Sequence, residues 1–207
     1  MIQLYHCARA RSFRPLWMLE EMGLPYQLHL LPFPPRALRK DYLGINPLGT
    51  VPYMVDGAVR MSESTGICHY LAETHGPTDL RIAPGEPDYA SYVNWLFFSD
   101  ATLTFPQAIV LRYGQFEAPE RKSAQVTEDY AQFFRGRMRT VTAALAERDF
   151  LCGGRFTTAD VAIGYALHLA EVWSGLSGDF APEVAAYLER LRARPAFQRA
   201  IAAETKS

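Results

Sequence analysis

The chain has 207 residues, of which 49% are hydrophobic and 21% are charged. This length and apolar share allow one large domain or two small ones, each with a buried core. The formal net charge of -1 gives no sign of the basic surface that nucleic-acid binding usually needs, so no nucleic-acid partner is predicted.

The sequence gives no indication of a membrane or secretory protein. No run of about 18 apolar residues is present, so no membrane-spanning helix is expected. Residues 1–5 read directly as a strand and lack the two regions of a signal peptide. The cysteines Cys7, Cys68 and Cys152 are odd in number and far apart, which disfavours a disulfide framework. We therefore predict a cytoplasmic protein with free thiols.

The first third of the chain alternates short apolar runs with helical patterns. The expected elements are a strand over 2–5, a helix over 12–22, a strand over 26–31, a short charged helix or turn over 36–43, strands over 53–55 and 58–61, and a helix over 64–74. Asp56-Gly57 is the strongest hairpin signal. Because a helix joins the first two strands, they must be parallel. This order predicts an α/β, thioredoxin-like domain.

The remainder of the chain reads as helical. Five Gly or Pro residues fall within residues 75–87 and mark a linker. The helical patterns that follow cover 88–113, 119–148, 158–172, 182–192 and 196–204. We predict a domain over 1–76, a linker over 77–87 and an all-α helical-bundle domain over 88–207.

One helix start in the second domain carries a sharp local signal. Thr157 and Asp160 are spaced as a capping box, in which the hydroxyl accepts from the Asp160 amide and the carboxylate reaches back. Phe156 and Val161 occupy the hydrophobic-staple positions. The predicted role of Asp160 is structural, in helix capping, and not catalytic.

Two segments of the first domain predict a binding site. In residues 46–52, Asn-Pro-Leu-Gly-Thr-Val-Pro, the proline after Val51 suits a cis X-Pro turn, which leaves the Val51 amide and carbonyl free. In residues 62–64, Ser-Glu-Ser, a helix start offers hydroxyls, a carboxylate and free N–H groups. Such a site fits a small extended peptide that carries both a carboxylate and an amine, as glutathione does.

In this order and spacing, the two segments resemble the glutathione-binding half of the glutathione transferase family. The capping box and the ending Arg194-Pro195-Ala196-Phe197 extend the resemblance over the whole chain. The resemblance implies a bacterial-type cytosolic transferase, with glutathione as co-substrate, a homodimeric assembly and a role in detoxification.

The resemblance also implies which residues hold glutathione. Val51 and Pro52 form the backbone clamp, with Val51 pairing in antiparallel fashion to the cysteinyl unit. Glu63 takes the γ-glutamyl ammonium and Ser64 its carboxylate, with help from the helix dipole.

The sequence offers no evident cation at Thr50 for the glycine carboxylate of glutathione. Thr50 stands where many relatives carry Lys or Gln, so it offers a hydroxyl but no charge. The glycine carboxylate then needs another cation, and Arg36, Arg39 and Lys40 lie on the bordering segment. We assign Arg39 to the site, with the other two as alternatives.

The residue that activates the thiol is not evident. Alignment with serine-type relatives places Ala10 at the catalytic position, and alignment with cysteine-type relatives places Arg11 there. Three substitutes remain: the Ser12 hydroxyl with its neighbouring amides, the Arg11 charge, and Tyr5, which resembles the tyrosine of tyrosine-type relatives. Each also has a structural reading, as an N-cap, a surface arginine and a core ring.

Other reactive residues have no assigned chemistry. Cys7 lacks a CxxC partner and is interpreted, like Cys68, as a packing residue. The histidines show no H-x-x-H or H-E-x-x-H spacing, so no metal is predicted.

The second substrate is expected at the first long helix of the second domain. By resemblance, Phe98, Thr102, Phe105 and Pro106 face the glutathione thiol, and an apolar wall there favours a small hydrophobic electrophile. The leading hypothesis is a transferase that conjugates the glutathione thiolate to such electrophiles. A glutathione-dependent disulfide or peroxide reductase and a non-catalytic glutathione- or ligand-binding protein are the alternatives.

Overall fold

The computed structural model describes residues 1–205. The chain divides into two compact units. The N-terminal unit comprises residues 1–81 and the chain from Arg192 onward, and the helical unit comprises residues 82–191. The break between the units falls inside the expected linker, and the last helix is grouped with the N-terminal unit and not with the expected all-α domain. The predicted architecture, a thioredoxin-like half and a helical half, is confirmed.

The N-terminal unit is built on a sheet with the strand order β2-β1-β3-β4. Strand β1 pairs in parallel with β2, as predicted, and in antiparallel fashion with β3, which pairs with β4. The elements of this unit are β1 (Ile2–His6), α1 (Phe13–Met22), β2 (Tyr26–Leu30), α2 (Pro35–Leu38), the 3₁₀ helix η1 (Lys40–Gly44), β3 (Tyr53–Asp56), β4 (Val59–Met61), α3 (Ser64–Thr74) and α9 (Pro195–Thr205).

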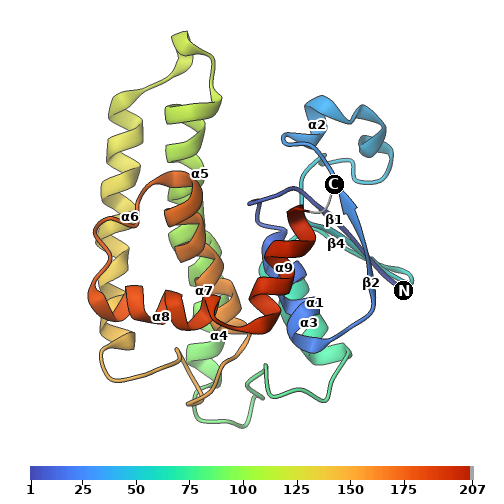
Figure 1. Ribbon diagram of the computed structural model, residues 1–207, viewed down its shortest axis with the longest axis vertical. Coiled ribbons are helices and arrows are strands. Elements are labelled where there is room, and N and C mark those ends of the chain that lie inside the picture. The colour runs from blue at the N-terminus through green and yellow to red at the C-terminus, as the bar shows by residue number, and fades with distance from the viewer. Residues whose placement is uncertain (206–207) are drawn as a thin grey trace. The chain divides into compact units, whose positions relative to one another are not determined.

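Helix α1 contacts both α3 and α9, and Figure 1 shows these helices on one side of the sheet. The ring of Phe197 on α9 packs edge-on against Phe13 and Trp17 of α1, with centroid distances of 5.2 and 4.9 Å. Arg194 forms a bidentate ion pair with Glu21, at 2.6 and 2.8 Å, at the far end of α1. Helix α9 therefore runs antiparallel to α1, and this packing explains its place in the N-terminal unit.

The other face of the sheet carries an aromatic cluster. Side chains alternate along a strand, so Tyr5 and His6 point to opposite faces. The ring of Tyr5 stacks on His29 at a centroid distance of 4.5 Å and also meets Tyr42 of η1 and Tyr53 of β3. The segment around η1 thus covers this face.

A long continuous helical segment forms one side of the helical unit. It runs through α4 (Tyr89–Phe97), η2 (Phe98–Thr104), α5 (Phe105–Leu111) and η3 (Arg112–Phe116), with η2 and η3 in π geometry. The other elements of the unit are the 3₁₀ helix η4 (Pro119–Arg121), α6 (Ala124–Leu145), α7 (Thr158–Leu169), the π-helical η5 (Ala170–Ser174) and α8 (Pro182–Arg192). Within residues 1–205, no helix is long and apolar enough to span a membrane.

A buried glutamine fixes the π segments within the helical unit. The Gln107 amide donates to the carbonyls of Leu103 and Ala166, at 3.1 and 2.9 Å, and its oxygen accepts from the Ser174 hydroxyl at 2.8 Å. These bonds join α5 to α7 and η5. Because π segments often occur at functional sites, η2 marks a region of interest.

The predicted capping box at the start of α7 is present. The Asp160 carboxylate is buried and accepts from the Thr157 amide at 2.8 Å. It also accepts from the Leu151 amide at 3.0 Å and the Tyr187 hydroxyl at 2.8 Å. Asp160 therefore joins three parts of the helical unit, in line with its predicted structural role.

Candidate functional site

The strand pairing brings the predicted site segments to one end of the sheet. Tyr5 pairs with Tyr53, and Met54 pairs with Met61, in antiparallel registers. Strands β1 and β4 therefore end where β3 begins. Neighbouring strands lie about 4.8 Å apart, so the loop after β1, the turn before β3 and the start of α3 meet at this edge.

The turn before β3 is held by its own side chains. Asn46 accepts from the Leu48 amide at 3.1 Å and donates to the Thr50 carbonyl at 2.9 Å. The Tyr42 hydroxyl donates to the same carbonyl at 2.8 Å. The Val51–Pro52 peptide bond is cis, as predicted. Thr50 is exposed, and its carbonyl serves the turn rather than a ligand.

Val51 is the residue of this turn with a backbone open to a ligand. Among residues 1–205, neither its amide nor its carbonyl has a hydrogen-bond partner, and its side chain is half-buried. Pro52 is buried behind it. A backbone that presents both groups at a strand end can pair with one residue of an extended peptide, as in strand addition.

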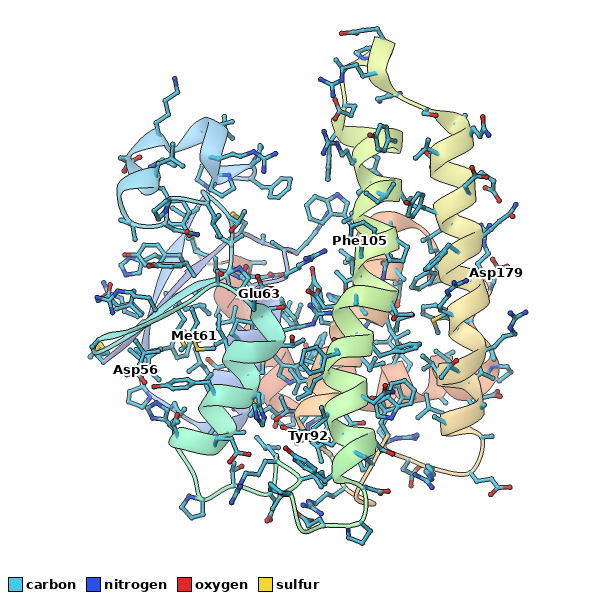
Figure 2. The ribbon with its side chains drawn as sticks, turned by 180° about the vertical axis from the view of Figure 1, so that it is seen from behind. Asp56, Met61, Glu63, Tyr92, Phe105 and Asp179 are labelled. Atoms are coloured by element: carbon cyan, nitrogen blue, oxygen red, sulfur yellow. The ribbon has the colours of Figure 1, made fainter. Side chains whose placement is uncertain are left out.

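The start of α3 offers a second set of contacts. Glu63 occupies the N-cap without a side-chain capping bond and is exposed. Figure 2 labels it at the start of α3. The amides of Ser64, Thr65 and Gly66 have no acceptor among the described residues. Ser64 is buried, and its hydroxyl accepts from Arg14 at 2.9 Å, which leaves the hydroxyl proton free to donate. Free amides and the positive helix end favour a bound carboxylate.

The loop between β1 and α1 engages the hydroxyl predicted for catalysis. Ser12 is fully buried, and its hydroxyl accepts from the Cys7 amide at 3.3 Å and donates to the Cys7 carbonyl at 3.4 Å. This bonding favours a structural role for the hydroxyl. The Ser12 backbone amide, by contrast, has no acceptor among the described residues. It lies at the positive end of α1, beside the partly exposed Arg11.

The other loop candidates differ in their surroundings. The ring of Tyr5 belongs to the aromatic cluster on the sheet face opposite α9, which favours its reading as a packed ring. Burial raises the pKa of the Cys7 thiol to about 12, so this thiol is not a reactive group near neutral pH. Cys7 and Cys68 are free and buried, as their interpretation as packing residues requires, and Cys152 is free and buried as well.

The cations near the predicted glycine end are not equivalent. Arg39 forms a bidentate pair with Asp41 at 3.0 and 2.8 Å, and both groups are exposed. Arg36 has no ion pair among the described residues. A β-carbon added at Gly49 would lie 2.7 Å from the Arg36 β-carbon, so Arg36 packs directly against the turn that precedes Val51.

The predicted co-substrate residues lie along η2 and the start of α5. Phe105, labelled in Figure 2, is 49% exposed and meets the ring of Tyr130 at 6.3 Å. Phe98 and Thr102 are half-buried, whereas Pro106 is buried. Phe98 and Phe105 therefore keep aromatic surface at the edge of the core, and Pro106 contributes mainly to packing.

Three residues near the site were not found by sequence reasoning. Arg14 is fully buried although arginine is usually exposed. His6 and Glu204 are linked across 198 positions of sequence. No local pattern signals either feature, because both depend on which helices pack together.

Comparisons with known proteins agree with this geometry. Residues 9–74 match the Glutathione S-transferase, N-terminal domain, and residues 124–190 match the Glutathione S-transferase, C-terminal domain. Glutathione S-transferase 3 of Zea mays is 30% identical over 195 residues, which cover 90% of this chain and 86% of that protein. GstA of Escherichia coli O157:H7 is 26% identical over 98% of both chains.

Two further comparisons define the extent of the likeness. Glutathione S-transferase 3 of Schizosaccharomyces pombe is 36% identical over 106 residues, half of this chain and 43% of that protein. A solved glutathione transferase from Methylococcus capsulatus has a TM-score of 0.84 and 27% identity, and the match covers 99% of this chain and 98% of that chain.

These matches and the two-part fold define a glutathione-dependent transferase with a thioredoxin-like half. The chain belongs to the glutathione S-transferase family.

Proposed function

We propose that this chain binds glutathione along the Val51 backbone and at the start of α3, and conjugates its thiolate to small hydrophobic electrophiles. The observation that carries the proposal is the meeting of three segments at one end of the sheet. Val51 supplies an unpaired backbone, Ser64 and its neighbouring amides suit a carboxylate, and Glu63 suits an ammonium group.

Transfer requires the bound thiol, with an ordinary pKa of about 8.5, to ionise near neutral pH. We assign this task to the positive end of α1, with Arg11 as a supporting charge. The Ser12 backbone amide at that end is buried with the rest of the residue, so it acts through its dipole and not by direct contact. Tyr5 and the Ser12 hydroxyl stay as alternatives that mutation can test. Preorganised donors stabilise developing negative charge without reorganisation during the reaction.

In the proposed reaction, the thiolate attacks an electrophilic carbon, a carbon–sulfur bond forms and the leaving group departs with its electron pair. Phe98, Thr102, Phe105 and Pro106 are proposed to meet the second substrate. The exposed ring of Phe105 and the half-buried ring of Phe98 favour an apolar molecule. We also propose that the chain forms a cytoplasmic homodimer with a role in detoxification. Light scattering at micromolar concentration would test the dimer by its molar mass.

The test is a calorimetric titration with glutathione, followed by thiolate absorbance of the complex between about pH 5 and 9. Binding with a thiol pKa well below 8.5 supports the transferase. Binding without a shift in thiol pKa supports a non-catalytic glutathione-binding protein, consistent with Ala10 at the position of the catalytic serine. No binding at all refutes the proposal.

The reductase alternative has one observation in its favour. Burial raises the pKa of Cys7 to about 12, so no loop thiol of the protein competes for a disulfide or peroxide, and glutathione would supply the only thiolate. Assays with a mixed disulfide and with an aromatic halide separate the two activities. Turnover of the halide alone would eliminate the reductase.

A further inference from the structure

The carboxylate of Glu204, near the end of α9, is bound to the loop that precedes α1. Its Oε2 accepts from the Arg9 backbone amide at 3.0 Å and lies 3.1 Å from Nε2 of His6. The His6 side chain is fully buried, and that of Glu204 is 7% exposed. A single oxygen therefore holds the last residue of β1 and the middle of the loop together.

The loop needs such a restraint. Arg9 has a φ of +63° and is the non-glycine residue with left-handed backbone among residues 1–205. This conformation is unfavourable for a residue with a β-carbon, and it persists only where surrounding contacts impose it. The Glu204 carboxylate binds the amide of this same residue.

The bonding at His6 fixes the direction of this contact. Nδ1 of His6 is buried and has no hydrogen-bond partner among the described residues. The ring therefore suits the tautomer with hydrogen on Nε2, which donates to Glu204, because a proton on Nδ1 would have no acceptor. The carboxylate thus receives two N–H donors, one from a side chain and one from the backbone.

Helix α9 is anchored independently of this contact. Phe197 packs on Trp17, Arg194 pairs with Glu21, and Arg199 pairs with Glu20 at 2.7 Å. The antiparallel course of α9 along α1 then carries Glu204 to the loop. The other end of the loop is fixed by the Ser12 hydroxyl on Cys7.

From this geometry we propose that Glu204 is a positioning residue for glutathione activation. It fixes the Arg9 backbone, and through the loop it sets the position of the Ser12 amide at the start of α1. The inference rests on the proposed function, in which the positive end of α1, to which that amide belongs, stabilises the thiolate. Helix α9 would thus influence the thiol indirectly, through the loop before α1, without itself contacting glutathione.

The experiment compares Glu204→Ala, Glu204→Gln and Arg199→Ala in the full chain. Glu204→Ala removes the acceptor from Arg9 and His6. Glu204→Gln keeps a carbonyl oxygen with two lone pairs, which can accept both bonds without the charge. Arg199→Ala breaks an exposed ion pair of the same helix and leaves the loop contact intact.

In Glu204→Ala, we expect amide exchange of residues 8–12 in the free protein to rise about tenfold or more. We also expect the thiol pKa of bound glutathione to rise and kcat at neutral pH to fall about tenfold, with a smaller change in KM. Glu204→Gln should restore both readouts, and Arg199→Ala should alter neither, even where it lowers Tm.

An unchanged thiol pKa in a folded Glu204→Ala variant overturns the proposal, as does a Gln variant that behaves like the Ala variant. If Glu204→Ala does not fold, the Gln variant decides: a wild-type thiol pKa supports positioning, and a raised one overturns it. If wild-type protein does not bind glutathione, the proposed function fails and the catalytic part of this inference fails with it. Hydrogen exchange at the Arg9 amide would still show whether Glu204 restrains the loop.

Discussion

The buried guanidinium of Arg14 donates a hydrogen bond to the Ser64 hydroxyl at 2.9 Å, and so joins α1 to the first residue of α3. The bond orients the hydroxyl so that its proton points away from Arg14. It also places a positive charge directly behind the helix start. Both effects favour a carboxylate bound in front of Ser64.

Ser64→Ala is predicted to weaken glutathione binding by about 10- to 100-fold, since a hydrogen bond to a charged group contributes about 1.5 to 3 kcal/mol. It also removes an acceptor from buried Arg14, so Tm should fall. Calorimetry and thermal unfolding measure the two effects. Ser62→Ala is the matched control, and comparable loss of affinity in that variant would contradict the role of Ser64.

Gly49→Ala is predicted to damage the turn before Val51. Gly49 has a φ of +60°, and an added β-carbon would lie 2.7 Å from the β-carbon of Arg36 and 2.8 Å from Cδ2 of Leu43. Strain and overpacking together should lower the free energy of unfolding by about 2 to 4 kcal/mol. Glutathione affinity should fall as well.

The control for this substitution is Gly44→Ala in the same segment. An added β-carbon at Gly44 meets no atom within 4 Å, and its φ is not positive. Chemical denaturation of both variants should show a change in midpoint for Gly49→Ala alone. Equal stability of the two variants would mean that the turn adapts and does not fix the clamp.

Arg36 and Arg39 can be separated by a ligand that lacks glycine. Arg39 is already paired with Asp41, whereas Arg36 packs against Gly49. Arg36→Ala should therefore weaken binding of glutathione about fivefold and leave binding of γ-glutamylcysteine unchanged. A larger effect from Arg39→Ala would show that Arg39 leaves Asp41 for the ligand, as the sequence-based assignment requires.

The elements predicted well from sequence are those with local causes. The capping box at Thr157–Asp160, the hairpin at Asp56-Gly57 and the cis bond before Pro52 each depend on neighbouring residues, and each is present. The helix over 64–74 was predicted with the bounds of α3. Periodicity and turn chemistry report such features because they are decided within a few residues.

The parts that sequence did not predict depend on distant packing. Arg14 is buried only because α1 packs on α3, and Glu204 reaches His6 only because α9 packs on α1. The Ser12 hydroxyl is engaged by Cys7, which a helix-start pattern cannot distinguish from an ordinary N-cap. The predicted helical domain includes the segment of α9 because the prediction follows the order of the helices along the chain, whereas α9 packs on α1.

Asp160 provides a test of stability against pH. Burial raises the pKa of its carboxyl to about 6, although the hydrogen bonds from Leu151, Tyr187 and Thr157 lower it. In the unfolded chain the carboxyl has an ordinary pKa of 3.8. The folded state therefore holds the proton more tightly, and this contribution to stability is complete below about pH 4 and is lost as the pH rises through about 6.

Asp160→Asn cannot ionise, so its stability lacks this pH dependence. This variant is expected to be less stable than wild type, because its side-chain NH₂ group faces N–H and O–H donors that need an acceptor. Each buried donor left without an acceptor lowers the free energy of unfolding by about 1 to 3 kcal/mol. The difference in unfolding free energy between the two proteins should narrow as the pH rises from about 4 to 7. Urea denaturation at several pH values measures this difference. A gap that widens with pH would mean that the hydrogen bonds outweigh burial and hold the folded pKa below 3.8.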